Sequence, residues 1–147
     1  MNTGIKRTLE WFQKATPTPD AKSVSSQLGC HFEEVVELLQ ALGLPHLELL
    51  EVSLDLKQGH YTQFLEDTLV NPSTRTEVLD ALGDQLVTAT GSAHVLNMDI
   101  IGALDEINRS NFTKFDKDEN PIKNENGKIM KGEFYTQPEL ETFANPA

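Results

Sequence analysis

Hydrophobic residues recur along most of the chain every three or four positions, which is the spacing of amphipathic helices. The pattern predicts five helical segments, at about residues 4–15, 25–42, 46–69, 73–97 and 100–111. Gly43 is predicted to end the second segment and Gly59 to interrupt the third. Ser73 or Thr74 is expected to cap the fourth segment, and Asp99 the fifth.

The chain from Phe115 onward loses this periodicity and gains turn-forming residues. Asn126-Gly127 lies between two short apolar stretches, a pattern typical of a short β-hairpin. We therefore expect an all-α fold in a single domain, 1–147, built as a bundle of about five helices with a four-helix core. The helical core is expected to cover about 4–114 and an irregular C-terminal arm 115–147.

The second predicted helix carries three glutamates on one side, Glu33, Glu34 and Glu37. Its apolar residues fall on the opposite side. Taken alone, this arrangement is most often the solvated face of an amphipathic helix.

The fourth predicted helix repeats the arrangement with Glu77, Asp80 and Asp84 on one face. From Gln85 to Met98 it has no charged residue, and a helix that is uncharged all round is normally buried all round. Buried carboxylates need counter-charges, yet positions 58–74 and 76–108 hold no lysine or arginine. Metal ions would supply the charge, and carboxylate oxygens favour Mg²⁺, with Mn²⁺ as the alternative.

Charge and composition narrow the function classes further. A net charge of -11 argues against a general nucleic-acid binder and against docking on anionic membranes. The single cysteine excludes an internal disulfide, and the first residues lack the apolar segment of a signal peptide. We therefore expect a cytoplasmic protein that contacts neither nucleic acid nor membrane.

Four segments, in this order, resemble the MazG-like and phosphoribosyl-ATP-pyrophosphohydrolase-like proteins. Residues 31–38 resemble the EExxE motif of this family, and residues 77–84 resemble its ExxD segment. Residues 106–114 resemble the end of the family's next helix, which carries an asparagine and a lysine. Residues 126–132, together with Tyr135 and Pro138, resemble the family's C-terminal arm. Ala81 stands where many relatives have a glutamate, so the choice of ligands on this helix stays open.

The resemblance implies a helical homodimer or homotetramer. It also implies hydrolysis of a nucleoside triphosphate between its α and β phosphates, which clears surplus or non-standard nucleotides. The expected metal ligands are Glu34, Glu37, Glu77, Asp80 and Asp84, and the expected catalytic residues are Glu33, Glu34, Glu37 and Asp84. The expected substrate contacts are Asn111, Lys114, Lys131 and Tyr135.

Three alternatives stay open at this point. An enzyme of the same fold could instead be specific for dUTP, dCTP or phosphoribosyl-ATP. The chain could be a non-catalytic helical protein that oligomerises or binds metal, with the acids as solvated faces. A nucleic-acid-binding or antitoxin-like role is disfavoured by the charge.

Overall fold

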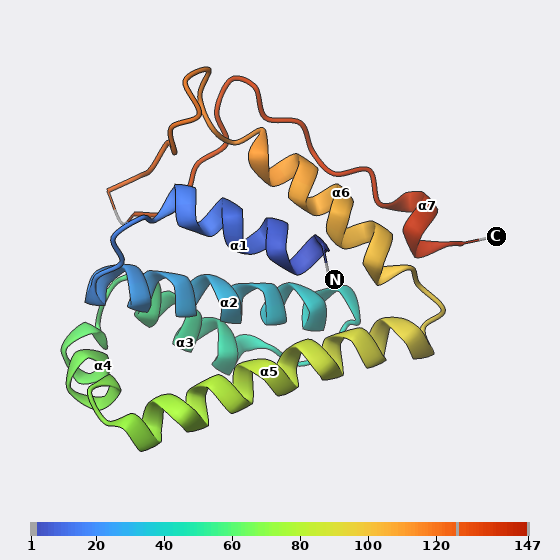
Figure 1. Cartoon of the computed structure of the whole chain (residues 1–147). Coiled ribbons are helices and arrows are strands. Elements are labelled where there is room, and N and C mark those ends of the chain that lie inside the picture. Colours follow the sequence, from blue (N-terminus) through green and yellow to red (C-terminus); the bar gives the residue numbers. More distant parts are fainter. Residues whose placement is uncertain (1–2, 126, 147) are drawn as a thin grey trace. The chain divides into compact units, whose positions relative to one another are not determined.

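The computed structural model describes residues 3–125 and 127–146. Over this range it contains seven helices and no extended strand, so the predicted all-α class is confirmed (Figure 1). The helices are α1 (Thr3–Ala15), α2 (Ala21–Ala41), α3 (Leu47–Lys57), α4 (Thr62–Leu69), α5 (Pro72–Val95), α6 (Ile100–Phe112) and α7 (Glu141–Ala144). The third predicted segment is thus two helices, and α7 lies in the arm.

Side-chain caps fix where several helices begin. Asp20 Oδ1 accepts a hydrogen bond from Ser23 N at 2.7 Å, so α2 begins about four residues before its predicted start. Asn71 Oδ1 accepts one from Ser73 N at 2.9 Å, so the prediction that Ser73 or Thr74 caps the fourth helix is wrong. Asp99 caps α6 through its side chain, as predicted.

Two glycines with positive φ end helices where the sequence predicts it. At the end of α2, Gly43 has φ +68, its N–H donates to Gln40 O, and Leu44 N donates to Leu39 O. This pair of bonds is a Schellman motif, which satisfies two otherwise unpaired carbonyls. Gly59 has φ +81 in the break between α3 and α4, as expected from its place in the third segment.

The described part of the chain forms two compact units. Unit 1 comprises Met1–Pro17, Arg75–Ile122 and Ile129–Ala147, and unit 2 comprises Thr18–Thr74 and Lys123–Lys128. The tip of the C-terminal arm therefore belongs to unit 2 and its flanks to unit 1. A single domain spanning 1–147 stays a prediction.

Unit 1 is built on the packing of α1 against α6 (Figure 1). Trp11, Ala15 and Phe115 are buried together, and the Trp11 and Phe115 rings stack 5.7 Å apart and nearly parallel. The indole N–H of Trp11 donates to Asn111 O at 2.8 Å, which gives its polar edge a partner. Trp11 is therefore a core residue of this unit.

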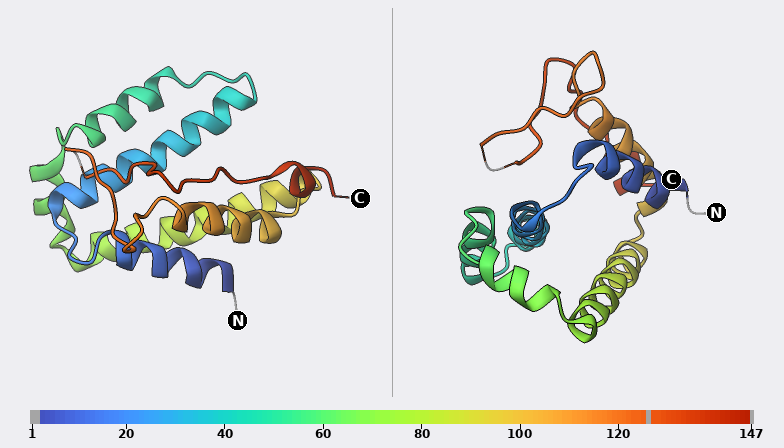
Figure 2. Two further views of the ribbon diagram at one scale, coloured as in Figure 1. Left: turned by 90° about the horizontal axis from the view of Figure 1, so that it is seen from above. Right: turned by 60° about the vertical axis from the view of Figure 1, so that its left-hand side comes forward.

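Unit 2 is built on a close pair of helices, α2 and α3, which lie side by side in both views of Figure 2. Gly29 lets the two backbones approach, since a Cβ there would lie 2.8 Å from both Ser53 O and Lys57 N. Two buried hydroxyls complete the contact. Ser53 Oγ donates to Gly29 O at 2.8 Å, and Ser25 Oγ donates to Leu56 O at 2.6 Å.

The helix α5 is not buried, so the prediction that it is buried all round is wrong for this structure. Within unit 1, α1 packs on α6 and α6 on α7, whereas none of these three described helices packs along α5. From Arg75 to Val95 every residue is exposed except Ala93. No described helix is both long and apolar enough to cross a membrane.

The C-terminal arm makes one narrow turn. Met130 N donates to Ile122 O at 2.7 Å, and Asn124 N donates to Lys128 O at 3.0 Å. These bonds form the closed end of a hairpin, but the described residues on either side do not extend it into strands. Asn126, on which the hairpin prediction partly rests, lies outside the described residues.

Candidate functional site

The three glutamates of α2 differ in their surroundings. Val36 is buried at 2% exposure, and α2 packs against α3 and α4. Glu34 and Glu37 are exposed, while Glu33 is half-buried. The predicted acidic face of this helix is therefore present, with Glu33 at its more sheltered edge.

Glu33 is held by two lysines of unit 2. Lys57 Nζ lies 2.6 Å from Glu33 Oε1, and Lys128 Nζ lies 3.1 Å from Glu33 Oε2. Partial burial raises the pKa of Glu33, but the hydrogen bonds and positive charges of the two lysines outweigh it, so its pKa is lowered. Lys128 is partly buried, which lowers its pKa, but the bond to Glu33 prevails and its pKa is raised.

Sequence reasoning missed both of these lysines. Lys57 and Lys128 lie 24 and 95 residues from Glu33, so no local spacing connects them to it. Both oxygens of Glu33 are occupied by lysines of the same unit, which disfavours Glu33 as a metal ligand.

The acids of α5 all lie on the surface. Glu77, Asp80 and Asp84 are all exposed, at the i, i+3, i+7 spacing that puts them on one face. The carboxylates of Asp80 and Asp84 make no ion pair or hydrogen bond with any residue that the structure describes. Exposed carboxylates without a cation are the donor chemistry that suits Mg²⁺.

The two sets of acids lie on different units, α2 in unit 2 and the acidic part of α5 in unit 1. Their convergence on a shared metal site stays a prediction. Within each unit, the described histidine, cysteine, aspartate and glutamate side chains form no cluster of three that could hold a metal ion.

The predicted substrate residues all belong to unit 1. Asn111 and Lys114 stand at the end of α6, and a Cβ at Gly132 would lie 3.3 Å from Lys114 O. The arm therefore passes directly over the end of this helix. Lys131 places its Nζ 4.7 Å from the centre of the Tyr135 ring, so the charged and the aromatic candidate are already adjacent.

A network of polar contacts fastens the arm to α6. The guanidinium of Arg109 donates to Glu106, to Thr136 Oγ1 and to Gln137 O, and Glu139 N donates to Glu106 Oε1. The hydrogen bonds from Arg109 and from the backbone of Glu139 lower the pKa of Glu106 to about 2. These contacts give the substrate candidates a fixed support.

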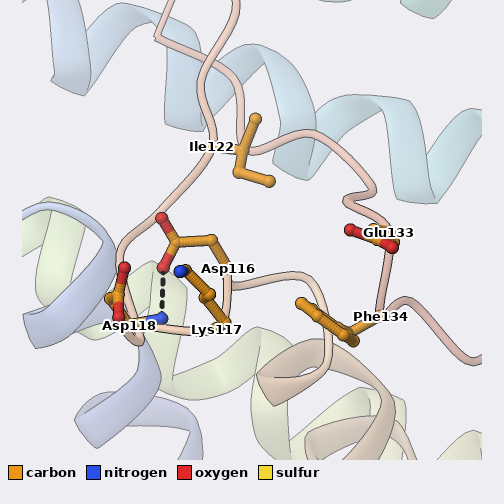
Figure 3. Close-up of a pocket in the computed structure, with 6 residues that line it drawn as sticks. All are labelled: Asp116, Lys117, Asp118, Ile122, Glu133 and Phe134. Atoms are coloured by element: carbon orange, nitrogen blue, oxygen red, sulfur yellow. Dashed lines mark hydrogen bonds between the residues drawn. The ribbon is translucent and has the colours of Figure 1, made fainter.

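An open pocket of about 270 Å³ lies elsewhere in unit 1, lined by Asp116, Lys117, Asp118, Ile122, Glu133 and Phe134 (Figure 3). It contains none of the predicted site residues. The carboxylate of Asp116 already accepts hydrogen bonds from Asp118 N and Asn120 N, at 2.9 and 2.8 Å. These bonds, both to Oδ1, lower the pKa of Asp116 and stabilise the turn of the loop.

Comparison of the chain with protein-family models, with curated proteins and with solved structures found no match.

Proposed function

We propose that this chain is a Mg²⁺-dependent pyrophosphohydrolase that cleaves a nucleoside triphosphate to a monophosphate and pyrophosphate. The observation that supports it most is the order of the four motifs along the sequence, which includes an acidic face on α2 and another on α5. Asp80 and Asp84 of the second face are exposed and have no cationic partner among the described residues, so both are accessible to a metal ion.

The residues that would hold the metal are Glu34 and Glu37 of α2 with Asp80 and Asp84 of α5. Glu77 is the next candidate ligand. Bound Mg²⁺ would screen the triphosphate charge and lower the pKa of a coordinated water. Glu33 is paired with Lys57 and Lys128, so it would orient neighbouring side chains or the attacking water rather than ligate the metal.

The nucleotide would lie against the end of α6 and the arm. Lys114 and Lys131 would contact phosphate oxygens as compact positive charges. Asn111 would donate to a phosphate or sugar oxygen, and Tyr135 would offer its ring to the base. Hydrogen bonds of Thr136 with Ser110 and Thr113 hold the arm against the end of α6. This favours the assignment, because side chains on a fixed backbone lose less conformational entropy when a ligand binds.

A nucleotide panel tests the activity. The purified protein is incubated with Mg²⁺ and each common ribo- and deoxyribonucleoside triphosphate, with dUTP, dCTP and phosphoribosyl-ATP included, and the products are identified. We expect the monophosphate and pyrophosphate in equal amounts, and no release of orthophosphate. Glu37→Gln and Asp84→Asn should each abolish the release without loss of helical content, whereas Glu10→Gln on α1 should leave it unchanged. Near-normal turnover in both site variants would refute the metal site.

A separate variant tests the phosphate contact. Lys114→Ala should raise KM for the triphosphate several-fold and change kcat less, because the lysine is expected to act on a bound phosphate that does not react. Lys117→Ala, three residues further along and exposed, is the matched control. An unchanged KM in Lys114→Ala would remove this residue from the site.

A further inference from the structure

Trp11 contacts two of the predicted substrate residues. Its indole Nε1 donates a hydrogen bond to Asn111 O at 2.8 Å, and the ammonium of Lys114 lies 5.7 Å from the centre of its ring. The ring is held in place, because it is only 6% exposed and stacks on Phe115. These residues all belong to unit 1. A single fixed side chain therefore touches both predicted ligand contacts at the end of α6.

The carbonyl of Asn111 joins the ring to the backbone of Lys114. Asn111 O accepts one hydrogen bond from Trp11 Nε1 at 2.8 Å and another from Lys114 N at 3.1 Å. The same ring lies against the ammonium of Lys114. The backbone and the side chain of Lys114 are thus both held relative to Trp11.

A lysine placed on an aromatic ring is ordered without losing its charge. The negative face of an indole attracts an ammonium group, and it does so more strongly than the other aromatic rings. This attraction restricts a flexible side chain, while the ammonium keeps N–H donors on the side away from the ring. An anion that approaches from this side meets a lysine that is already in place, so less conformational entropy is lost on binding.

We propose that Trp11 is a positioning residue, which holds the Lys114 ammonium at the point where an oligophosphate chain binds. An oligophosphate suits this position better than a nucleobase, because the buried ring of Trp11 offers no open face on which a base could stack. Lys131, the second predicted phosphate contact, also lies on a ring, that of Tyr135. The inference rests on the proposed function for the identity of the site, but it requires only that the phosphates bind there, not that they are cleaved.

The first experiment uses the fluorescence of Trp11, which is the single tryptophan of the chain. Indole emission responds to nearby charge, so Lys114→Ala should shift the emission of the ligand-free protein. Lys114→Arg should shift it much less, because a guanidinium also rests on aromatic rings. Inorganic tripolyphosphate is then titrated in the presence of Mg²⁺. The emission should change saturably in the natural protein and in Lys114→Arg, but not in Lys114→Ala. Lys117→Ala, which removes an exposed lysine of the same unit, is the matched control and should respond like the natural protein.

The second experiment measures the affinity for tripolyphosphate by calorimetry. Trp11→Leu removes the ring and should raise the dissociation constant about two- to ten-fold, the range expected when one long side chain must be ordered on binding. Trp11→Phe keeps a weaker ring and should raise it about two-fold, which preserves the test if Trp11→Leu does not fold. Phe12→Leu is the matched control, because Phe12 packs against the same core and also changes from aromatic to aliphatic. It should keep the natural dissociation constant, whereas a purely structural role of Trp11 predicts equal effects of Trp11→Leu and Phe12→Leu.

This inference and the proposed function fail on different results. If Lys114→Ala leaves the emission of the ligand-free protein unchanged, the contact between ammonium and ring is refuted. If the folded Trp11 variants keep the natural dissociation constant, or if the natural protein does not bind tripolyphosphate, the positioning role is refuted even where a nucleotide is hydrolysed. A saturable emission change that depends on Lys114, in a protein that hydrolyses no nucleotide, would support the positioning role and refute the proposed function.

Discussion

Replacing Gly29 with alanine tests the close contact between α2 and α3. The new Cβ would lie 2.8 Å from Ser53 O and from Lys57 N, and 2.5 Å from Lys57 Cγ. The flexible lysine stem can move aside, but the two backbone atoms cannot. Ordinary contact begins at 3.4 Å, so α3 must retreat by roughly 0.6 Å along this line.

That movement has a calculable cost. It lengthens the hydrogen bond from Ser53 Oγ to Gly29 O from 2.8 Å toward a distance at which it contributes little. Overpacking costs about 1–3 kcal/mol, and a weakened buried hydrogen bond about 1 kcal/mol more. Alanine offsets about 1 kcal/mol of this through its better helix propensity. The expected net loss of unfolding free energy is therefore about 1–3 kcal/mol.

Urea denaturation followed by circular dichroism measures the effect. Gly91→Ala is the matched control, since Gly91 also lies inside a helix but a Cβ there meets no atom within 4 Å. It should stabilise the protein by about 0.5–1 kcal/mol. The difference in unfolding free energy between the two variants gives the packing cost, because both gain the helix propensity of alanine. If Gly29→Ala were as stable as Gly91→Ala, the close approach of α2 and α3 would be incorrect.

Two further predictions concern unit 1. Trp11→Phe keeps the ring stack but removes the indole donor and leaves Asn111 O with only backbone donors such as Lys114 N. It should therefore cost about 0.5–1.5 kcal/mol in thermal or urea unfolding, and an unchanged midpoint would contradict the bond. The pKa of Glu106 is lowered to about 2 in the folded protein, below the ordinary glutamate pKa of about 4.3. Its hydrogen bonds with Arg109 and the Glu139 amide therefore stabilise the fold fully above about pH 4.3, and this stabilisation is lost as the pH falls toward about 2. A carboxyl titration by NMR should show this low pKa, and Glu106→Gln should speed hydrogen exchange at the Glu139 amide; titration near pH 4.3 would contradict the contact with Arg109.

Local signals in the sequence predict the helices well. Apolar periodicity gives the approximate place of α1, α2, α5 and α6, while Gly43 and Asp99 mark boundaries by backbone and capping chemistry that act within a few residues. The early start of α2 was missed because Asp20 follows a run of threonines and prolines that resembles a loop. A single well-placed carboxylate nevertheless begins the helix there.

Contacts between residues far apart in the sequence, and the burial that depends on them, could not be predicted from local signals. The uncharged half of α5 predicts burial, yet its residues are exposed, because composition does not specify whether another element folds onto a helix. The lysines that hold Glu33 were missed because their contact depends on how α3 and the arm tip fold onto α2. The contact between the Lys131 ammonium and the Tyr135 ring was not predicted, because the sequence gives the two residues only as separate substrate candidates.

The division of the chain into units has a consequence for any attempt to study them separately. The backbone passes from one unit to the other after Pro17, Thr74, Ile122 and Lys128. No single cleavage of the backbone yields a whole unit, and truncation at Ile122 would remove a piece of each. Limited digestion should therefore give nicked protein that stays associated under native conditions and separates only in denaturant.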